Sequence, residues 1–200
     1  MKIFVNEEER ELKVASVSTL ATVMEMVSDT LPNGYVITDI QLNGKFLDKN
    51  WNETASKTYL LDDDNLAFRV EEAAGIAIDI LRETKEYLIE LLVNFDSIAK
   101  AFRISEEEEA NSKFVAGIDH LQDYLRALGD ATALLGKPLE TIIVNDVLFS
   151  QYINELAVIL DNVIKTQNQK DWIMLADVIE YEMIPALKKM GLLYAILDIQ

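Results

Sequence analysis

Cysteine is absent from this 200-residue chain, and histidine occurs once, at His120. Without cysteine the protein has no disulfide, no thiolate metal ligand and no cysteine nucleophile. A di-iron carboxylate bundle needs Glu-x-x-His on two helices, which one histidine cannot supply. We therefore expect no catalytic residues, no cofactor and no bound metal.

Glycine and long apolar runs are also scarce. Seven glycines leave little material for strained active-site loops, and the GKP at Gly136 lacks the rest of a phosphate-binding loop. No apolar run approaches the roughly 18 residues of a membrane span, and the opening KIFV is too short for a signal peptide. These features predict a cytoplasmic protein that is not an enzyme.

Acidic residues dominate the charge: 35 Asp and Glu against 18 Lys and Arg give a formal net charge of −17. Such a surface repels phosphate backbones and anionic lipids, so neither nucleic acid nor membrane is expected as a partner. A basic protein partner is compatible with this charge. The alternative that the charge serves only solubility stays open.

The first seventy-two residues show strand patterns around one helical pattern. Ser18-Thr19 is expected to cap a helix that ends at the Leu31-Pro32-Asn33-Gly34 turn signal. Asn43-Gly44 predicts a hairpin turn. Strands are expected at residues 2–5, 11–15, 35–42, 45–47 and 65–70. The predicted order is β-β-α-β-β-β.

This order and these residues resemble the ubiquitin-like β-grasp family. MKIFV is similar to the first strand of ubiquitin, and residues 39–70, with LNGKFLD and TYLLDDDNLAFRV, align with that family without a gap. The resemblance implies a β-grasp fold and little about activity, since this fold hosts many functions. Conjugating members end in a free Gly-Gly, whereas this chain continues past Gly75, so conjugation is not expected. The receptor-binding positions of ubiquitin fall on Gln41 and Arg69, so that patch is not carried over.

The rest of the chain has apolar residues at helical spacing. The first stripe consists of Leu81, Thr84, Leu88, Leu91, Phe95, Ile98 and Phe102. Two further stripes run from Phe114 to Leu128 and from Phe149 to Val163, and Asn145 or Asp146 is expected to cap the latter helix. The predicted fold class is α+β: a β-grasp domain over residues 1–72, then an antiparallel bundle of about four helices over residues 73–200.

The last long helix, over residues 169–190, shows two apolar stripes instead of one. Its broad face is the predicted core face and consists of Trp172, Leu175, Ala176, Ile179, Met183, Ala186, Leu187 and Met190. Across the helix, Met174, Val178, Tyr181 and Pro185 form a narrow second stripe between charged residues. We interpret this second stripe as the candidate partner contact. A kink is expected at Pro185, which has no N–H for the carbonyl of Tyr181.

Three segments contain acidic or histidine residues of the kind found in metal or catalytic sites. Ser105 and Glu108 match a capping box, which explains the acidic run at residues 106–109 without a metal. Asp177 and Glu180 are spaced to form an acid pair, but no basic or metal-binding residue is spaced to complete a site. His120 is expected to be a surface or half-buried structural residue.

The preferred hypothesis is a non-enzymatic protein-interaction or adaptor protein that uses its acidic surface and the second stripe to bind a protein partner or to form a homodimer. A narrower alternative is a bacterial secretion or flagellar-export chaperone or accessory factor. A third is a small-molecule-binding protein or enzyme with a pocket between the two domains.

Overall fold

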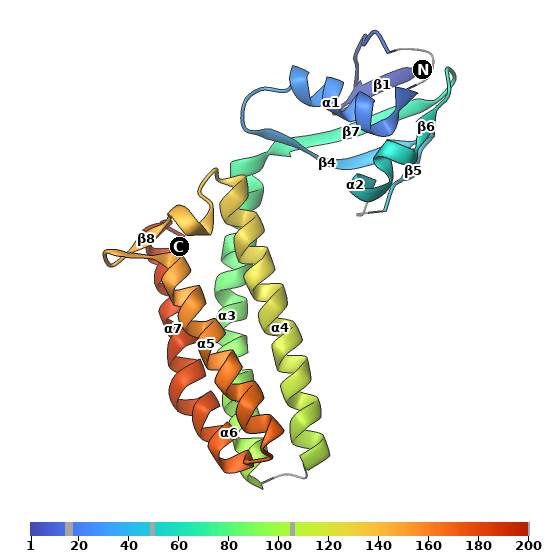
Figure 1. The fold of residues 1–200 in the computed structure, drawn as a ribbon. Coiled ribbons are helices and arrows are strands. Elements are labelled where there is room, and N and C mark those ends of the chain that lie inside the picture. Colours follow the sequence, from blue (N-terminus) through green and yellow to red (C-terminus); the bar gives the residue numbers. More distant parts are fainter. Residues whose placement is uncertain (15–17, 49–50, 105–106, 200) are drawn as a thin grey trace. The chain divides into compact units, whose positions relative to one another are not determined.

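The computed structural model describes residues 1–14, 18–48, 51–104 and 107–199. The chain divides into two compact units, Met1–Gly75 and Ile76–Gln200 (Figure 1). The sequence-based boundary lay after Glu72, where strand β7 ends and helix α3 begins. Ser105 of the predicted capping box and Glu106 of the acidic run at residues 106–109 lie outside the described residues.

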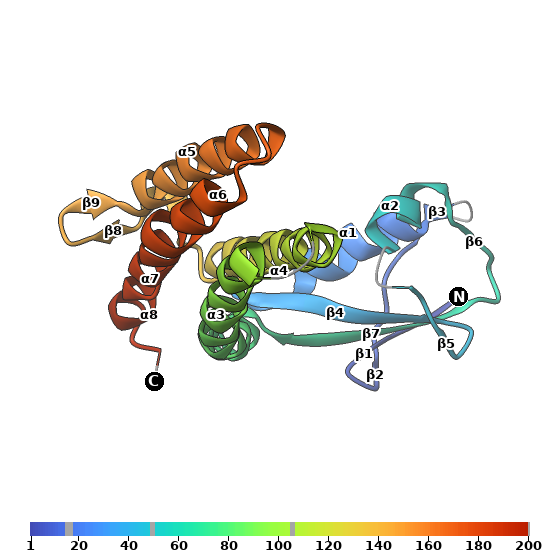
Figure 2. The same cartoon turned by 90° about the horizontal axis from the view of Figure 1, so that it is seen from below.

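The first unit is a mixed five-stranded sheet of order β2-β1-β7-β4-β5, with helix α1 across one face (Figure 2). Strands β1 and β7 are parallel, and the other pairs in this sheet are antiparallel. Its elements are β1 Lys2–Val5, β2 Glu8–Glu9, β3 Ser18–Thr19, α1 Leu20–Thr30, β4 Tyr35–Leu42, β5 Lys45–Phe46, α2 Trp51–Thr54, η1 Ala55–Lys57, β6 Tyr59–Leu60 and β7 Asn65–Glu72. This topology is a β-grasp, so the predicted fold of the N-terminal part is confirmed.

The core of the first unit lies between α1 and the sheet. Leu20, Val23 and Val27 of α1 are fully buried, as is Leu66 of β7. Alternation places Leu66, Phe68 and Val70 on the face toward the core, as predicted. Thr19 caps α1 by accepting a hydrogen bond from the backbone N–H of Thr22.

The second predicted strand, at residues 11–15, is wrong over residues 11–14, and residue 15 lies outside the described residues. Strand β2 lies earlier, at Glu8–Glu9, because Asn6 and Glu7 both adopt positive φ and turn the chain back within two residues. Asn6 is held there by two hydrogen bonds with Val70, one from its side-chain amide to the carbonyl and one from the Val70 N–H. The predicted Asn43-Gly44 turn is present, with positive φ at both residues.

The second unit is an antiparallel helical bundle, which confirms the predicted architecture. Its elements are α3 Ala73–Ile104, α4 Glu107–Leu134, η2 Leu139–Thr141, β8 Ile143–Val144, β9 Val147–Leu148, α5 Phe149–Asn168, α6 Trp172–Val178, η3 Ile179–Met183, α7 Ile184–Met190 and α8 Leu192–Ile196. The predicted stripe from Leu81 to Phe102 is buried along its whole length. No helix within the described ranges is long and apolar enough to cross a membrane.

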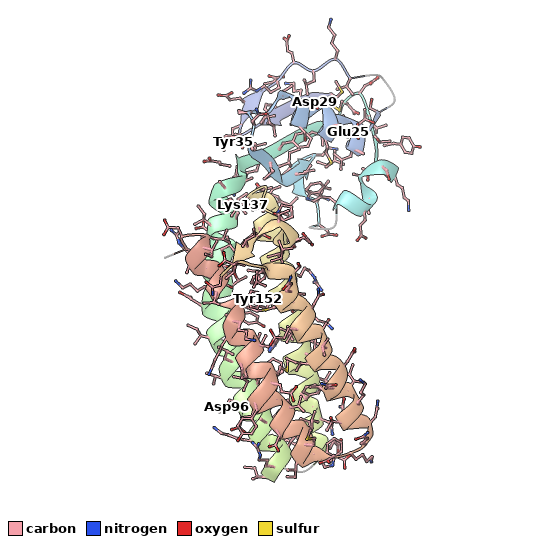
Figure 3. The ribbon with its side chains drawn as sticks, turned by 60° about the vertical axis from the view of Figure 1, so that its left-hand side comes forward. Glu25, Asp29, Tyr35, Asp96, Lys137 and Tyr152 are labelled. Atoms are coloured by element: carbon pink, nitrogen blue, oxygen red, sulfur yellow. The ribbon has the colours of Figure 1, made fainter. Side chains whose placement is uncertain are left out.

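The predicted cap of the third bundle helix is wrong. Asn145 and Asp146 have positive φ and form the turn of the β8–β9 hairpin, and α5 starts only at Phe149. The hydroxyl of Tyr152 donates a hydrogen bond to the Val144 carbonyl at 3.4 Å, which fastens the hairpin to α5. Tyr152 lies at the same end of the bundle as Lys137, and Asp96 lies toward the other end (Figure 3).

Candidate functional site

The predicted second stripe of the last helix does not form one continuous surface. Met174 is 50% exposed and Tyr181 67%, and Pro185 is also exposed. Val178, however, is 2% exposed and belongs to the bundle core. The interpretation of Val178 as a partner-contact residue is therefore wrong.

The last helix departs from a simple helical wheel in two ways. A π-helical turn interrupts it, and neighbouring helices cover more than one of its sides. Between α6 and α7 lies a π-helical turn, η3, in which the N–H of Ile184 donates to the carbonyl of Ile179. Tyr181 lies within this wider turn, so the 3.6-residue spacing that aligned it with Val178 does not hold there. The π-helical turn ends at Met183, two residues before Pro185, where the sequence predicts a kink.

Helix α6 also has neighbours on more than one side. It packs against α5, and Trp172 stacks on Phe102 of α3 with the ring centroids 5.7 Å apart. A helix between two neighbours buries a wider arc than a surface helix with one. Val178 lies within that wider arc.

Tyr181 and Pro185 instead line an open groove of about 580 Å³ between α5 and the η3–α7 segment. The two helical segments lie side by side in Figure 1 (orange and red). The groove is lined by Glu155, Val158, Ile159 and Asn162 of α5 and by Tyr181, Glu182, Pro185, Ala186 and Lys189 of η3 and α7. Val158, at 62% exposed, contributes a second large apolar side chain that water reaches.

Sequence reasoning missed the α5 side of this groove. The sequence predicts one apolar stripe on this helix, from Phe149 to Val163. The signal that could have found the groove was Val158, an apolar residue that lies outside that stripe and is 62% exposed. Only the folded bundle shows that Val158 lines the same hollow as Tyr181.

Charged groups flank the apolar part of the groove. Lys189 Nζ lies 2.6 Å from Glu155 Oε1, so an ion pair joins the two helices at one end. Both side chains are 44% exposed, so this pair contributes at most about 1 kcal/mol to stability. Glu182 forms no ion pair with the described part of the chain. The lining thus carries two carboxylates and one ammonium group.

The acid pair Asp177 and Glu180 is completed by a residue far away in sequence. Arg103 of α3 places Nη2 2.6 Å from Asp177 Oδ1 and Nη1 2.5 Å from Glu180 Oε2. The hydrogen bond to Asp177, followed by the one to Glu180, raises the pKa of the Arg103 guanidinium. This two-pronged contact ties α3 to the start of the π-turn, and one guanidinium engages both carboxylates.

Two other polar groupings have structural explanations. His120 is exposed, lies 3.5 Å from the Asn94 side-chain amide through Nδ1 and meets the ring of Tyr87 edge-on. In the core, the Tyr194 hydroxyl donates to the Tyr124 hydroxyl at 3.2 Å, and burial raises the pKa of both phenols. Across residues 1–14, 18–48, 51–104 and 107–199, no group of three or more His, Asp or Glu side chains is placed to hold a metal ion.

Comparison with known proteins matches the helical unit to a family. Residues 79–192 fit the model of a family described as a domain of unknown function, DUF8042, and this span contains every residue of the groove. No curated protein matches the sequence. Among solved structures, the thiamine biosynthesis protein ThiS from Geobacter metallireducens is similar, at 19% identity over 34% of this chain and 90% of that chain, with a TM-score of 0.24. The β-grasp assignment rests on the sheet order and not on this likeness.

Proposed function

The chain belongs to the family of the domain of unknown function DUF8042, and we propose that it is a non-enzymatic interaction protein that binds another protein through the groove between α5 and α7. The observation that carries the proposal is the exposure of Val158 and Tyr181 in one hollow, at 62% and 67%. Single exposed apolar side chains are ordinary, but several that converge in one hollow are typical of a protein-interaction site.

The polar chemistry near the groove supports contact rather than catalysis. Asp177 and Glu180 are both held by Arg103, which engages Oδ1 of the first and Oε2 of the second. These two oxygens already accept charge-assisted hydrogen bonds within the chain, so they are not free to bind a substrate.

Site-specific photo-crosslinking in the native host tests the proposal. A photoreactive phenylalanine analogue in place of Tyr181 is expected to form a covalent adduct with a protein. The matched control carries the same analogue in place of Val93, which is 66% exposed on α3 of the same unit. The adduct should also disappear when Val158→Glu places a charge in the groove.

The proposal fails if no adduct forms from position 181, or if the adducts from positions 181 and 93 are the same. Circular dichroism and the urea midpoint of each variant establish that the bundle is folded. Because the substituted side chains are exposed, each substitution should change the unfolding free energy by no more than about 0.5 kcal/mol.

A further inference from the structure

We infer that the occupant of the groove is an amphipathic α-helix of a partner protein, with Lys or Arg residues beside its apolar face. This inference rests on the proposed function and names the partner's chemistry. It follows from the shape of the groove, from the helical nature of its walls and from its charge.

The shape fits a helix. Helices α5 and α7 run antiparallel and leave a groove along their length, which is where a third helix packs in helical bundles. From Glu155 to Asn162 the lining spans about 10 Å of α5, at about 1.5 Å per residue. Two turns of a bound helix cover that length and place apolar side chains at positions i, i+3 or i+4, and i+7 against Val158, Tyr181 and Pro185.

The walls disfavour an extended peptide. A peptide that binds as a strand gains affinity from main-chain hydrogen bonds to a free sheet edge. Both walls of this groove are helical, and helices use their N–H and C=O groups internally. A helical ligand satisfies its own backbone and needs only side-chain contacts from the groove.

The acidic charge of the groove and of the whole chain favours a basic partner over a second copy of this chain. Glu182 is free of ion pairs with the described residues, and Glu155 is shared with Lys189 at one end. A second copy approaches with its own net charge of −17, so long-range repulsion opposes a homodimer. A helix with Lys or Arg beside its apolar face is attracted instead, and Glu182 offers it a carboxylate at the groove wall.

Fluorescently labelled designed peptides test the inference on the full chain. Three peptides share one length: an amphipathic helix with lysines on its polar face, the same apolar face with glutamates, and a scrambled lysine peptide without an apolar face. Because Glu182 and the net charge of −17 repel glutamate side chains, the lysine helix is expected to bind at least about tenfold more tightly than the glutamate helix by fluorescence anisotropy. Its affinity should exceed that of the scrambled peptide, and it should fall with added salt.

Matched variants assign the binding to the groove. Val158→Ser and Tyr181→Ser should each weaken binding of the lysine helix by about tenfold. A loss of this size is typical of the few interface residues that carry most of the binding energy. Val93→Ser, at an equally exposed valine of α3, should leave binding unchanged. Glu182→Gln should reduce the preference for lysine over glutamate, whereas Glu83→Gln on α3 should not.

The outcomes separate this inference from the proposed function. Equal binding of the lysine and glutamate helices overturns the inference, as does a Tyr181 adduct to a second copy of the chain. If position 181 forms an adduct with a partner protein but none of the three peptides binds, the inference is overturned. The proposed function survives in that case. If no adduct forms from position 181, the proposed function itself fails, whatever the peptides do.

Discussion

Val178 and Val158 offer the sharpest test of the structure, because they are the same residue type with opposite environments. Val178 is 2% exposed in the core and Val158 is 62% exposed in the groove. Val178→Ala removes two methyl groups, worth about 1.6 kcal/mol in transfer free energy at about 0.8 kcal/mol each. A residual cavity raises the cost to about 3 kcal/mol, and the better helix propensity of alanine returns about 0.5 kcal/mol.

The expected loss of unfolding free energy for Val178→Ala is therefore about 1–2.5 kcal/mol, against at most about 0.5 kcal/mol for Val158→Ala. With a urea slope of about 2 kcal/mol per molar, these values lower the midpoint by roughly 0.5–1.2 M and by less than roughly 0.3 M.

Tryptophan fluorescence can follow the bundle separately. The chain has two tryptophans, and Trp51 contacts the core of the first unit. In a Trp51→Phe background the signal comes from Trp172, whose ring stacks on Phe102. If Val158→Ala lowers the midpoint as much as Val178→Ala does, the division of this region into core and groove is refuted.

Two further predictions concern the polar groups that stabilise each unit. Tyr194→Phe and Tyr124→Phe each break the hydrogen bond between the two buried hydroxyls and should each cost about 1–2 kcal/mol in urea unfolding, whereas the double variant should cost less than the sum because each single variant already breaks that bond. A hydrogen bond from the Leu61 N–H, and then one from the Asn43 amide, lowers the pKa of the Asp64 carboxyl below its ordinary value of 3.8. Because the folded pKa is the lower one, this stabilisation is complete above pH 3.8 and is lost as the pH falls below it through the folded value. Urea midpoints of the first unit between about pH 6 and about pH 3 should therefore fall less steeply in Asp64→Asn than in the wild type, and equal slopes would contradict this account.

Local patterns explain why much of the fold could be predicted. Residues Leu66, Phe68 and Val70 alternate at the period of a strand, and the stripe from Leu81 to Phe102 repeats at the period of a helix. The Asn43-Gly44 turn needs positive φ at two positions, and few other dipeptides supply it. These signals lie within a few residues of each other, so one sequence suffices to identify them.

A second turn with similar residue types was harder to predict, because its residues also fit a helix cap. Asn145 and Asp146 fit a helix cap and a hairpin turn equally well by residue type. The structure uses them as a turn, because Val144 packs into the core and Tyr152 fastens the hairpin to α5. That choice depends on contacts outside the local segment.

The candidate site could be predicted only in part. The second apolar stripe on the last helix drew attention to its outer side, where Tyr181 and Pro185 line a groove. Val178 was wrongly assigned to the exposed stripe, because a helical wheel assumes one regular helix with one buried side. The π-turn and the neighbours α3 and α5 alter both conditions.

By itself, the sequence determined the class of each unit, the acidic charge and the positions of most core residues, since these follow from composition and from the periods of strand and helix. The tertiary structure alone decided which polar and apolar residues meet across separate helices. Arg103 reaches Asp177 and Glu180 across more than seventy residues of chain, and Val158 joins Tyr181 in one groove only when α5 packs beside η3 and α7. Such meetings depend on how helices pack, which the period of a single segment does not encode.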